Sequence, residues 1–306
     1  MFLYGSDESP NDEAEKVYGK VLEEEHWPNP SVSSAADRKT AATGSTGVKM
    51  TGPYEYLAPN YWLEDRRRGG AFGFNTETSP GPAIPVRESL DEMLPKEHLW
   101  PIDDFWSFHA GGGSYRNVNV FRAALEGRYG KVKDLDDFLK KSQAMSYEGE
   151  RAMFEACGRN KYGATGVVQW MLNSKLVSSN FYWLSTQRDV SDFAAGNGSF
   201  TRIKTYADLT GLEQLPEAKV TVTTRTEQKG TEEVEHVMVE NPTSQLAFFV
   251  HLTVLKGKDG TDVKPVLWED NYFELMPHEK REIAAGFHRK LLGGAKAYIK
   301  VDGWNQ

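Results

Sequence analysis

Two short stretches decide the fold, Phe-Gly-Phe-Asn-Thr-Glu at residues 72–77 and Phe-Leu-Tyr-Gly-Ser-Asp at residues 2–7. In each, a short apolar run that contains glycine leads directly into a carboxylate. Buried parallel strands are typically short, continuous apolar runs, and a carboxylate at the carboxyl end of a barrel strand is typical of a catalytic group. A pair of carboxylates facing one cleft is the equipment for cleaving a glycosidic bond. Asp7 and Glu77 are therefore the candidate catalytic residues.

Composition limits the classes of protein that need to be considered. With 306 residues, 39% of them hydrophobic, the chain has room for one large domain or two ordinary ones. Its net charge of −8 argues against a nucleic-acid partner. No window approaches the roughly 18 apolar residues of a membrane span, and no basic segment precedes an apolar one at the N-terminus, so we predict neither a membrane partner nor a signal peptide. The localisation stays unknown, because the single Cys157 does not identify a compartment.

The first part of the chain alternates predicted strands with predicted helices. Apolar residues recur at helical spacing after Pro10 and Asn11, and again in three later segments. Repeated strand–helix units imply a parallel sheet, and the right-handed crossover rule favours part of a (β/α)8 TIM barrel. The expected helices cover about 14–22, 86–94, 118–127 and 135–156, and the strands besides the two opening stretches cover about 31–35, 48–50 and 167–172.

The second part has a different pattern from about Lys219 onward. Helical spacing stops, and short alternating segments are separated by turn sequences such as Asn-Pro-Thr-Ser at 241–244. This pattern predicts an antiparallel, immunoglobulin-like β-sandwich of about a hundred residues. The expected strands cover 219–225, 234–239, 247–255, 272–276 and 295–301.

Aromatic residues supply the candidate substrate-binding groups. A long loop at about 51–70 contains Tyr54 and Trp62, and a loop of this length is often functional. These two side chains either line a sugar cleft or pack the loop, and the residues alone leave both open. Trp170 is by itself more typical of a core residue than of a sugar platform. Asp7 has its own alternative, as a cap for the helix that follows it.

Metal and cofactor motifs are not found in the sequence. His109 has no partner at a metal-binding spacing. The three glycines at 111–113 lack the pattern of a phosphate-binding loop. We therefore predict no metal and no cofactor, and we interpret Cys157 as a structural thiol.

Four segments resemble the exo-β-D-glucosaminidases, which are chitosan-degrading enzymes of glycoside hydrolase family 2. Residues 69–82 (Gly-Gly-Ala-Phe-Gly-Phe-Asn-Thr-Glu-Thr-Ser-Pro-Gly-Pro), 147–162 and 167–173 resemble the catalytic barrel of these enzymes. Residues 268–277, which begin Trp-Glu-Asp-Asn-Tyr-Phe, resemble their C-terminal sandwich. Ser-Asp at residues 6–7 stands where most members of the wider family have Asn-Glu, and this departure resembles the glucosaminidase branch.

The resemblance implies roles for individual residues. Asp7 matches the general acid/base after the fourth barrel strand, Glu77 matches the nucleophile after the seventh, and Trp170 matches the aromatic wall of the sugar site after the eighth. The implied mechanism is retaining, with the two carboxyl groups about 5–5.5 Å apart. The implied partner is a carbohydrate, chitosan or a chitooligosaccharide, and an acidic chain suits that polycation.

The same resemblance implies a shortened domain plan. Residues 1–173 would form a partial TIM-barrel catalytic domain with about the fourth to eighth strands, 174–192 a remnant of one immunoglobulin-like sandwich, and 193–306 a nearly complete C-terminal one. Two functions follow. One is exo-acting release of glucosamine from non-reducing ends, and the other is a non-catalytic remnant whose stable part is the last sandwich. A β-mannosidase-like hydrolase of the same family is a further alternative, and for the isolated chain we expect weak activity or none.

Overall fold

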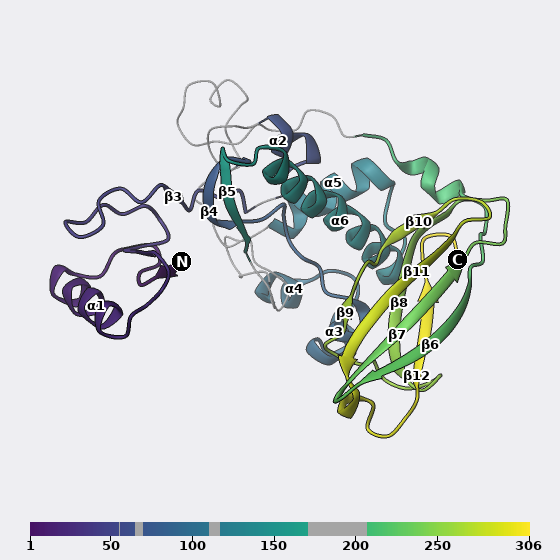
Figure 1. The fold of residues 1–306 in the computed structure, drawn as a ribbon. Coiled ribbons are helices and arrows are strands. Elements are labelled where there is room, and N and C mark those ends of the chain that lie inside the picture. Colours follow the sequence, from purple (N-terminus) through teal and green to yellow (C-terminus); the bar gives the residue numbers. More distant parts are fainter. Residues whose placement is uncertain (55, 65–69, 110–116, 171–206) are drawn as a thin grey trace. The chain divides into compact units, whose positions relative to one another are not determined.

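The computed structural model describes residues 1–54, 56–64, 70–109, 117–170 and 207–306. The chain divides into two compact units, Met1–Leu209 and Thr210–Gln306 (Figure 1). The domain boundaries predicted after residues 173 and 192 lie outside the described residues, so those boundaries stay predictions.

Two small parallel sheets form the strands of the first unit. β1 (Phe2–Leu3) pairs with β2 (Ser31–Val32). β3 (Val48–Lys49), β4 (Gly73–Thr78) and β5 (Ala164–Gln169) form a second sheet in the order β3-β4-β5. Each pairing is parallel, as expected for strands that are linked by helices. The described strands lie in two sheets rather than in one continuous sheet, so the α/β class is confirmed but the partial barrel is not.

Two helices of the first unit, α1 and α6, begin at residues whose side chains cap them. The Asn11 side chain accepts a hydrogen bond from the Ala14 amide (2.9 Å), and Asp134 accepts one from the Asp137 amide (2.9 Å). Each of these two side chains thus gives a hydrogen-bond acceptor to a backbone amide of the first turn, which has no partner within its helix. The four helices predicted from apolar spacing are confirmed as α1, α3, α5 and α6. The helical segments are α1 (Asp12–Glu24), α2 (Pro59–Glu64), α3 (Arg87–Met93), the 3₁₀ segment Lys96–His98, α4 (Asp104–His109), α5 (Asn117–Tyr129) and α6 (Leu135–Arg159).

The long helix α6 provides the apolar wall of the first unit. Phe138, Met145 and Met153 recur along one face and are fully buried, which is the pattern of an amphipathic helix against a core. Helix α2 and strand β5 both pack on α6. The apolar cluster between α2 and α6 consists of Leu57, Tyr61, Trp62, Ala71, Ala152, Met153 and Ala156.

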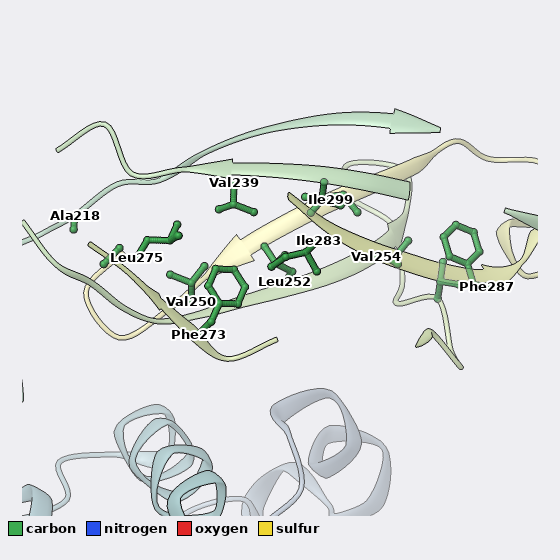
Figure 2. Close-up of a cluster of buried hydrophobic side chains, with 14 of the residues drawn as sticks. Ala218, Val239, Val250, Leu252, Val254, Phe273, Leu275, Ile283, Phe287 and Ile299 are labelled. Atoms are coloured by element: carbon green, nitrogen blue, oxygen red, sulfur yellow. The ribbon is translucent and has the colours of Figure 1, made fainter. Parts of the chain in front are cut away.

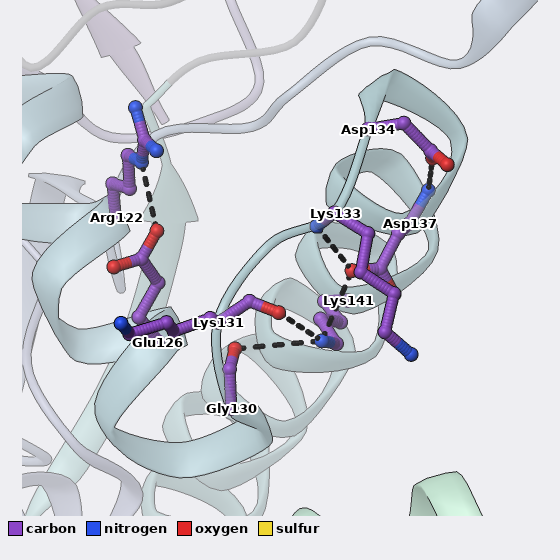
Figure 3. Close-up of polar contacts among 8 residues, drawn as sticks. All are labelled: Arg122, Glu126, Gly130, Lys131, Lys133, Asp134, Asp137 and Lys141. Atoms are coloured by element: carbon purple, nitrogen blue, oxygen red, sulfur yellow. Dashed lines mark hydrogen bonds and ion pairs between the residues drawn. The ribbon is translucent and has the colours of Figure 1, made fainter.

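A buried lysine fixes the end of α5 to α6 (Figure 3). The Lys141 ammonium is fully buried and donates to the carbonyls of Lys131 (3.0 Å) and Gly130 (3.4 Å). It also lies 3.1 Å from the Asp137 carboxylate. A cation is favourable beside the carbonyls at a helix C-terminus, and the carboxylate neutralises the buried charge. The connection between the two helices is therefore held from inside.

The second unit is an antiparallel β-sandwich. One sheet has the order β6-β7-β11-β9 and the other the order β10-β8-β12. The predicted strands correspond to β6, β7, β8, β10 and β12, whereas β9 and β11 were not predicted. The strands are β6 (Thr221–Lys229), β7 (Glu232–Glu240), β8 (Ala247–Lys256), β9 (Leu267–Trp268), β10 (Phe273–Leu275), β11 (Lys280–His288) and β12 (Ala297–Asp302), with 3₁₀ segments at Thr210–Gln214 and Arg289–Leu292.

Alternating side chains from both sheets fill the sandwich (Figure 2). Val237 and Val239 of β7 meet Leu252 and Val254 of β8, and all four are at most 1% exposed. Period-two burial of this kind is what a strand with one buried face produces. The sequence-based prediction of an immunoglobulin-like fold for this region is therefore confirmed.

Candidate active site

Strand β4 holds Glu77 at the centre of the three-stranded sheet. Because β4 pairs with β3 on one side and β5 on the other, ladder hydrogen bonds fix its backbone from both edges. Thr76 is buried, and its hydroxyl lies 2.8 Å from the Ala35 carbonyl and 3.0 Å from the Lys49 carbonyl. The Glu77 side chain, on the opposite face of the strand, is half-buried. Glu77 thus stands on a rigid support.

Tyr54 contacts the Glu77 carboxylate directly. Its hydroxyl donates a hydrogen bond of 3.2 Å to Glu77 Oε2, and its side chain is only 4% exposed. Burial and the negative charges of Glu77 and Asp7 raise the pKa of Tyr54 well above its usual range. Tyr54 therefore stays protonated and acts as a donor to Glu77.

Trp170 packs against Tyr54. The two rings meet edge to face with centroids 5.4 Å apart, a favourable arrangement for aromatic pairs. The Trp170 amide donates to the Thr78 carbonyl (2.8 Å), which ties the end of β5 to the end of β4. Trp170 is half-buried, so part of the residue remains accessible to solvent. The structure thus brings together Tyr54, Glu77 and Trp170, three of the residues selected from the sequence.

Asp7 follows β1 and has an exposed side chain. Its charge acts on both Glu77 and Tyr54, so the carboxylate lies within electrostatic range of the pair. That Asp7 and Glu77 face a common cleft at the separation of a retaining pair stays a prediction.

The environment of Glu77 favours its protonated form. Burial raises the pKa of Glu77 above its ordinary value, the Asp7 charge raises it further, and the hydrogen bond from Tyr54 counters both. Desolvation and a second carboxylate are the usual means by which enzymes tune a carboxyl group. The negative charges of Asp7 and Glu77 would also attract a cation that enters the site, because opposite charges attract most strongly at short distance.

Trp62 lies in the apolar core and not on an open surface. Its ring is 1% exposed and belongs to the cluster between α2 and α6. It meets Tyr61 edge to face at 5.2 Å. The segment predicted as one long loop contains helix α2 at this point, and of the two alternatives left open for Trp62 its burial favours packing over a place in a sugar cleft.

Thr76 is a supporting residue that the sequence did not indicate. Its hydroxyl reaches the carbonyl of Ala35, 41 positions earlier in the chain, and so links the end of β2 to the strand of Glu77. A threonine in a strand is ordinary for β-structure, so no local pattern could distinguish this one.

Within the described ranges, no three or more His, Cys, Asp or Glu side chains are gathered so that they could hold a metal ion. No helix in that same part of the chain is long and apolar enough to cross a bilayer.

Comparison with known proteins finds similarity to exo-β-D-glucosaminidases. Residues 199–306 match the profile of the exo-β-D-glucosaminidase Ig-fold domain. Over 99% of its length the chain is 30% identical to an exo-β-D-glucosaminidase of Streptomyces avermitilis, of which it covers 47%. It is 27% identical to an exo-β-D-glucosaminidase of Arthroderma benhamiae over 99% of its length, again covering 47% of that protein.

Solved structures show the same fold. The crystal structure of Amycolatopsis orientalis exo-chitosanase CsxA aligns with 100% of this chain at a TM-score of 0.82 and 24% identity, and 50% of that chain is covered. A second structure, which concerns inhibition of the exo-β-D-glucosaminidase CsxA by a glucosamine-configured castanospermine, aligns at a TM-score of 0.83 and 25% identity over the same share of each chain. The chain is therefore similar to glycosidases of the exo-β-D-glucosaminidase type over nearly its whole length, and it spans about half the length of the curated relatives it matches.

Proposed function

We propose that this chain carries the catalytic pair of a retaining, exo-acting glycosidase that releases glucosamine from the non-reducing ends of chitosan or chitooligosaccharides. The main support for the proposal is that Tyr54 contacts both Glu77 and Trp170, and that the negative charge of Asp7 acts on Glu77. Similarity to exo-β-D-glucosaminidases over 99% of the chain supports it.

Glu77 is assigned the role of nucleophile. Its ionised carboxylate attacks the anomeric carbon, the bond to the leaving oxygen breaks, and a covalent glycosyl–enzyme ester forms. The central position of β4 suits this step, because a nucleophile must be held close to the bond that it attacks. The Tyr54 hydroxyl stabilises the ionised form that the attack requires.

Asp7 is assigned the role of general acid and then of general base. In the first step it donates its proton to the leaving oxygen, so that the departing sugar leaves as an alcohol. In the second step the Asp7 carboxylate takes a proton from a water molecule, which attacks the anomeric carbon and releases Glu77. Over the full cycle one water is consumed and Asp7 regains its proton.

Glucosamine is the proposed sugar because its ammonium group suits two neighbouring carboxylates. The half-buried Trp170 offers an apolar face for the sugar, and aromatic faces also attract cations. One solved relative is a complex of CsxA with PNP-β-D-glucosamine. A mannose unit carries a hydroxyl and no charge at the same position, so comparing the glucosaminide with the mannoside of the same leaving group tests the choice of sugar.

Hydrolysis by the 306-residue chain tests the proposal. We expect weak but measurable release of p-nitrophenol from PNP-β-D-glucosaminide and of glucosamine from its β-1,4-linked disaccharide. Glu77→Gln should lower both rates on the order of 10³-fold. The matched control is Glu13→Gln, which changes an exposed glutamate of α1 and should leave both rates unchanged. Equal effects of the two variants would contradict the assignment.

A non-catalytic role is the second candidate. It is favoured by the division of the described parallel strands into two sheets, since a catalytic barrel needs one closed sheet. In that case the wild-type chain would hydrolyse neither substrate, while the sandwich of the second unit would still fold.

A further inference from the structure

The turn that carries Asp7 is packed tightly against the loop after β2. A Cβ atom added at Gly5 would lie 2.3 Å from the Ser33 carbonyl oxygen and 2.4 Å from the Glu8 carbonyl oxygen. The Ala35 amide donates to the carbonyls of both Gly5 (3.1 Å) and Ser6 (3.0 Å). The backbone before Asp7 is therefore determined by its contacts with residues about thirty positions later in the chain.

Arg38 completes this contact from the same loop. Its Nε donates to the backbone carbonyl of Asp7 (2.9 Å), and its Nη2 donates to the Glu8 carboxylate (2.7 Å). The planar guanidinium group of Arg38 thus binds two successive residues of the turn. Because this forked group is rigid, its two hydrogen bonds fix the orientation of the turn.

The backbone of Arg38 is itself held in place. Its amide donates to the Ser34 hydroxyl (3.3 Å), and its carbonyl accepts from the Ser33 hydroxyl (2.8 Å). Ser33 and Ser34 are both fully buried directly after β2. Arg38 therefore joins the turn of Asp7 to the rigid end of a strand.

The Asp7 carboxylate has little to orient it directly. Among the described residues its nearest hydrogen-bonding neighbour is the adjacent Ser6 hydroxyl at 3.4 Å, on an exposed surface. The direction of the side chain is therefore set through its backbone. We propose that Arg38 is a positioning residue, which holds the Asp7 backbone so that its carboxyl group reaches the leaving oxygen. This inference rests on the proposed function, in which Asp7 is the acid.

Comparison of two substrates with each variant gives the decisive readout. p-Nitrophenolate leaves without being protonated, whereas the oxygen between two sugars needs the proton of Asp7. Arg38→Ala should lower kcat/KM for the glucosamine disaccharide by about tenfold or more, since small misplacements of a reacting group are costly. The same variant should change kcat/KM for PNP-β-D-glucosaminide by less than about twofold. The melting temperature should hardly move, because exposed ion pairs contribute little to stability.

Two further variants distinguish the positioning effect of the Arg38 guanidinium from the effect of its positive charge alone. Arg38→Lys keeps the positive charge but loses the planar fork, so it should behave like Arg38→Ala. Arg87→Ala removes another exposed arginine, which pairs with Asp91 and Asp136 in the same unit, and should change neither substrate. Rescue by lysine, or equal losses on both substrates, would overturn the positioning role.

Amide hydrogen exchange across residues 2–9 gives a result that does not depend on turnover. Exchange in this segment should be faster in Arg38→Ala than in the wild type and unchanged in Arg87→Ala. If the wild type hydrolyses neither substrate, the proposed function fails, and faster exchange would still support the contact of Arg38 with the turn. Unchanged exchange in Arg38→Ala would overturn the inference whether or not the chain is active.

Discussion

The Tyr54 hydroxyl lies 3.2 Å from the Glu77 carboxylate, and it opposes the two influences that favour protonation of that group. Burial and the charge of Asp7 raise the pKa of Glu77, while the hydrogen bond from Tyr54 lowers it. A nucleophile must be ionised to attack. Tyr54 therefore extends the range of pH in which Glu77 can act.

Tyr54→Phe should shift the pH dependence of hydrolysis. Without the hydroxyl, the pKa of Glu77 rises further, so the acidic limb of the kcat/KM profile should move to higher pH. Activity should fall more at about pH 4 than at about pH 7 because carboxyl groups titrate in the lower range. Tyr162→Phe, at an exposed tyrosine, is the matched control and should leave the profile in place. An unshifted limb in Tyr54→Phe would mean that Glu77 is not the group whose ionisation limits the rate.

Glu77→Gln should stabilise the fold at neutral pH. A carboxyl group whose folded pKa lies above its unfolded value binds more protons in the native state, so stability is lost as pH rises through the interval between the two values. Glutamine removes this cost and can still accept the bond from Tyr54. The melting temperature of the variant should exceed that of the wild type at about pH 7, and the difference should vanish at about pH 3, below both values. A lower melting temperature of the variant at neutral pH would contradict the raised pKa.

Gly5→Ala and Gly19→Ala should have opposite effects on stability. The alanine at position 5 would collide with the Ser33 and Glu8 carbonyls, and backbone atoms give way only at a cost of about 1–3 kcal/mol. Gly19 lies within α1 and has no atom within 4 Å of an added Cβ. Alanine there should stabilise by about 0.5–1 kcal/mol. Chemical denaturation of both variants, followed by helical circular dichroism, checks the contrast, and equal effects would mean that the turn before Asp7 is not tightly packed.

Leu252→Ala should destabilise the sandwich of the second unit strongly. Leu252 is 1% exposed at the centre of the core shared by β7, β8 and β11, so the free energy of unfolding should fall by about 2–5 kcal/mol. Leu267→Ala, at a residue of β9 that is 81% exposed, should change it by less than about 0.5 kcal/mol. Urea denaturation of each variant measures both values. A small loss for Leu252→Ala would contradict the core described above.

Local patterns were sufficient to predict the strands that carry the candidate site. The apolar, glycine-containing runs before Asp7 and Glu77 predicted β1 and β4, but neither strand is buried as a continuous apolar run: Phe2 is exposed, and the buried residues of β4 are Asn75, Thr76 and Thr78. Alternation along β8 likewise predicted one strand of the sandwich, since Val250, Leu252 and Val254 share its buried face. For β8 the local sequence and the tertiary environment require the same residues, because apolar side chains at alternate positions fill the sandwich.

Other features depend on contacts that no local pattern contains. Strand β11 was missed because Ala284, Ala285 and Gly286 have low strand propensity, and its position between β7 and β9 compensates for that. Tyr54 and Glu77 are 23 residues apart, so their hydrogen bond depends on the path of the intervening loop. The burial of Trp62 depends on α6, which lies more than seventy residues later.

Azide rescue of two variants tests the catalytic assignment most directly. In Glu77→Ala no glycosyl–enzyme ester can form, so azide should attack PNP-β-D-glucosaminide itself and give the α-glycosyl azide. In Asp7→Ala the ester still forms at Glu77, and azide should then displace it to give the β-glycosyl azide.

The anomeric configuration of the azide product, read by nuclear magnetic resonance, decides the outcome. We expect the α-anomer from Glu77→Ala and the β-anomer from Asp7→Ala, so one measurement distinguishes the two variants. The same anomer from both variants, the reverse assignment, or no azide product from either would contradict the claim that Glu77 is the nucleophile and Asp7 the acid/base.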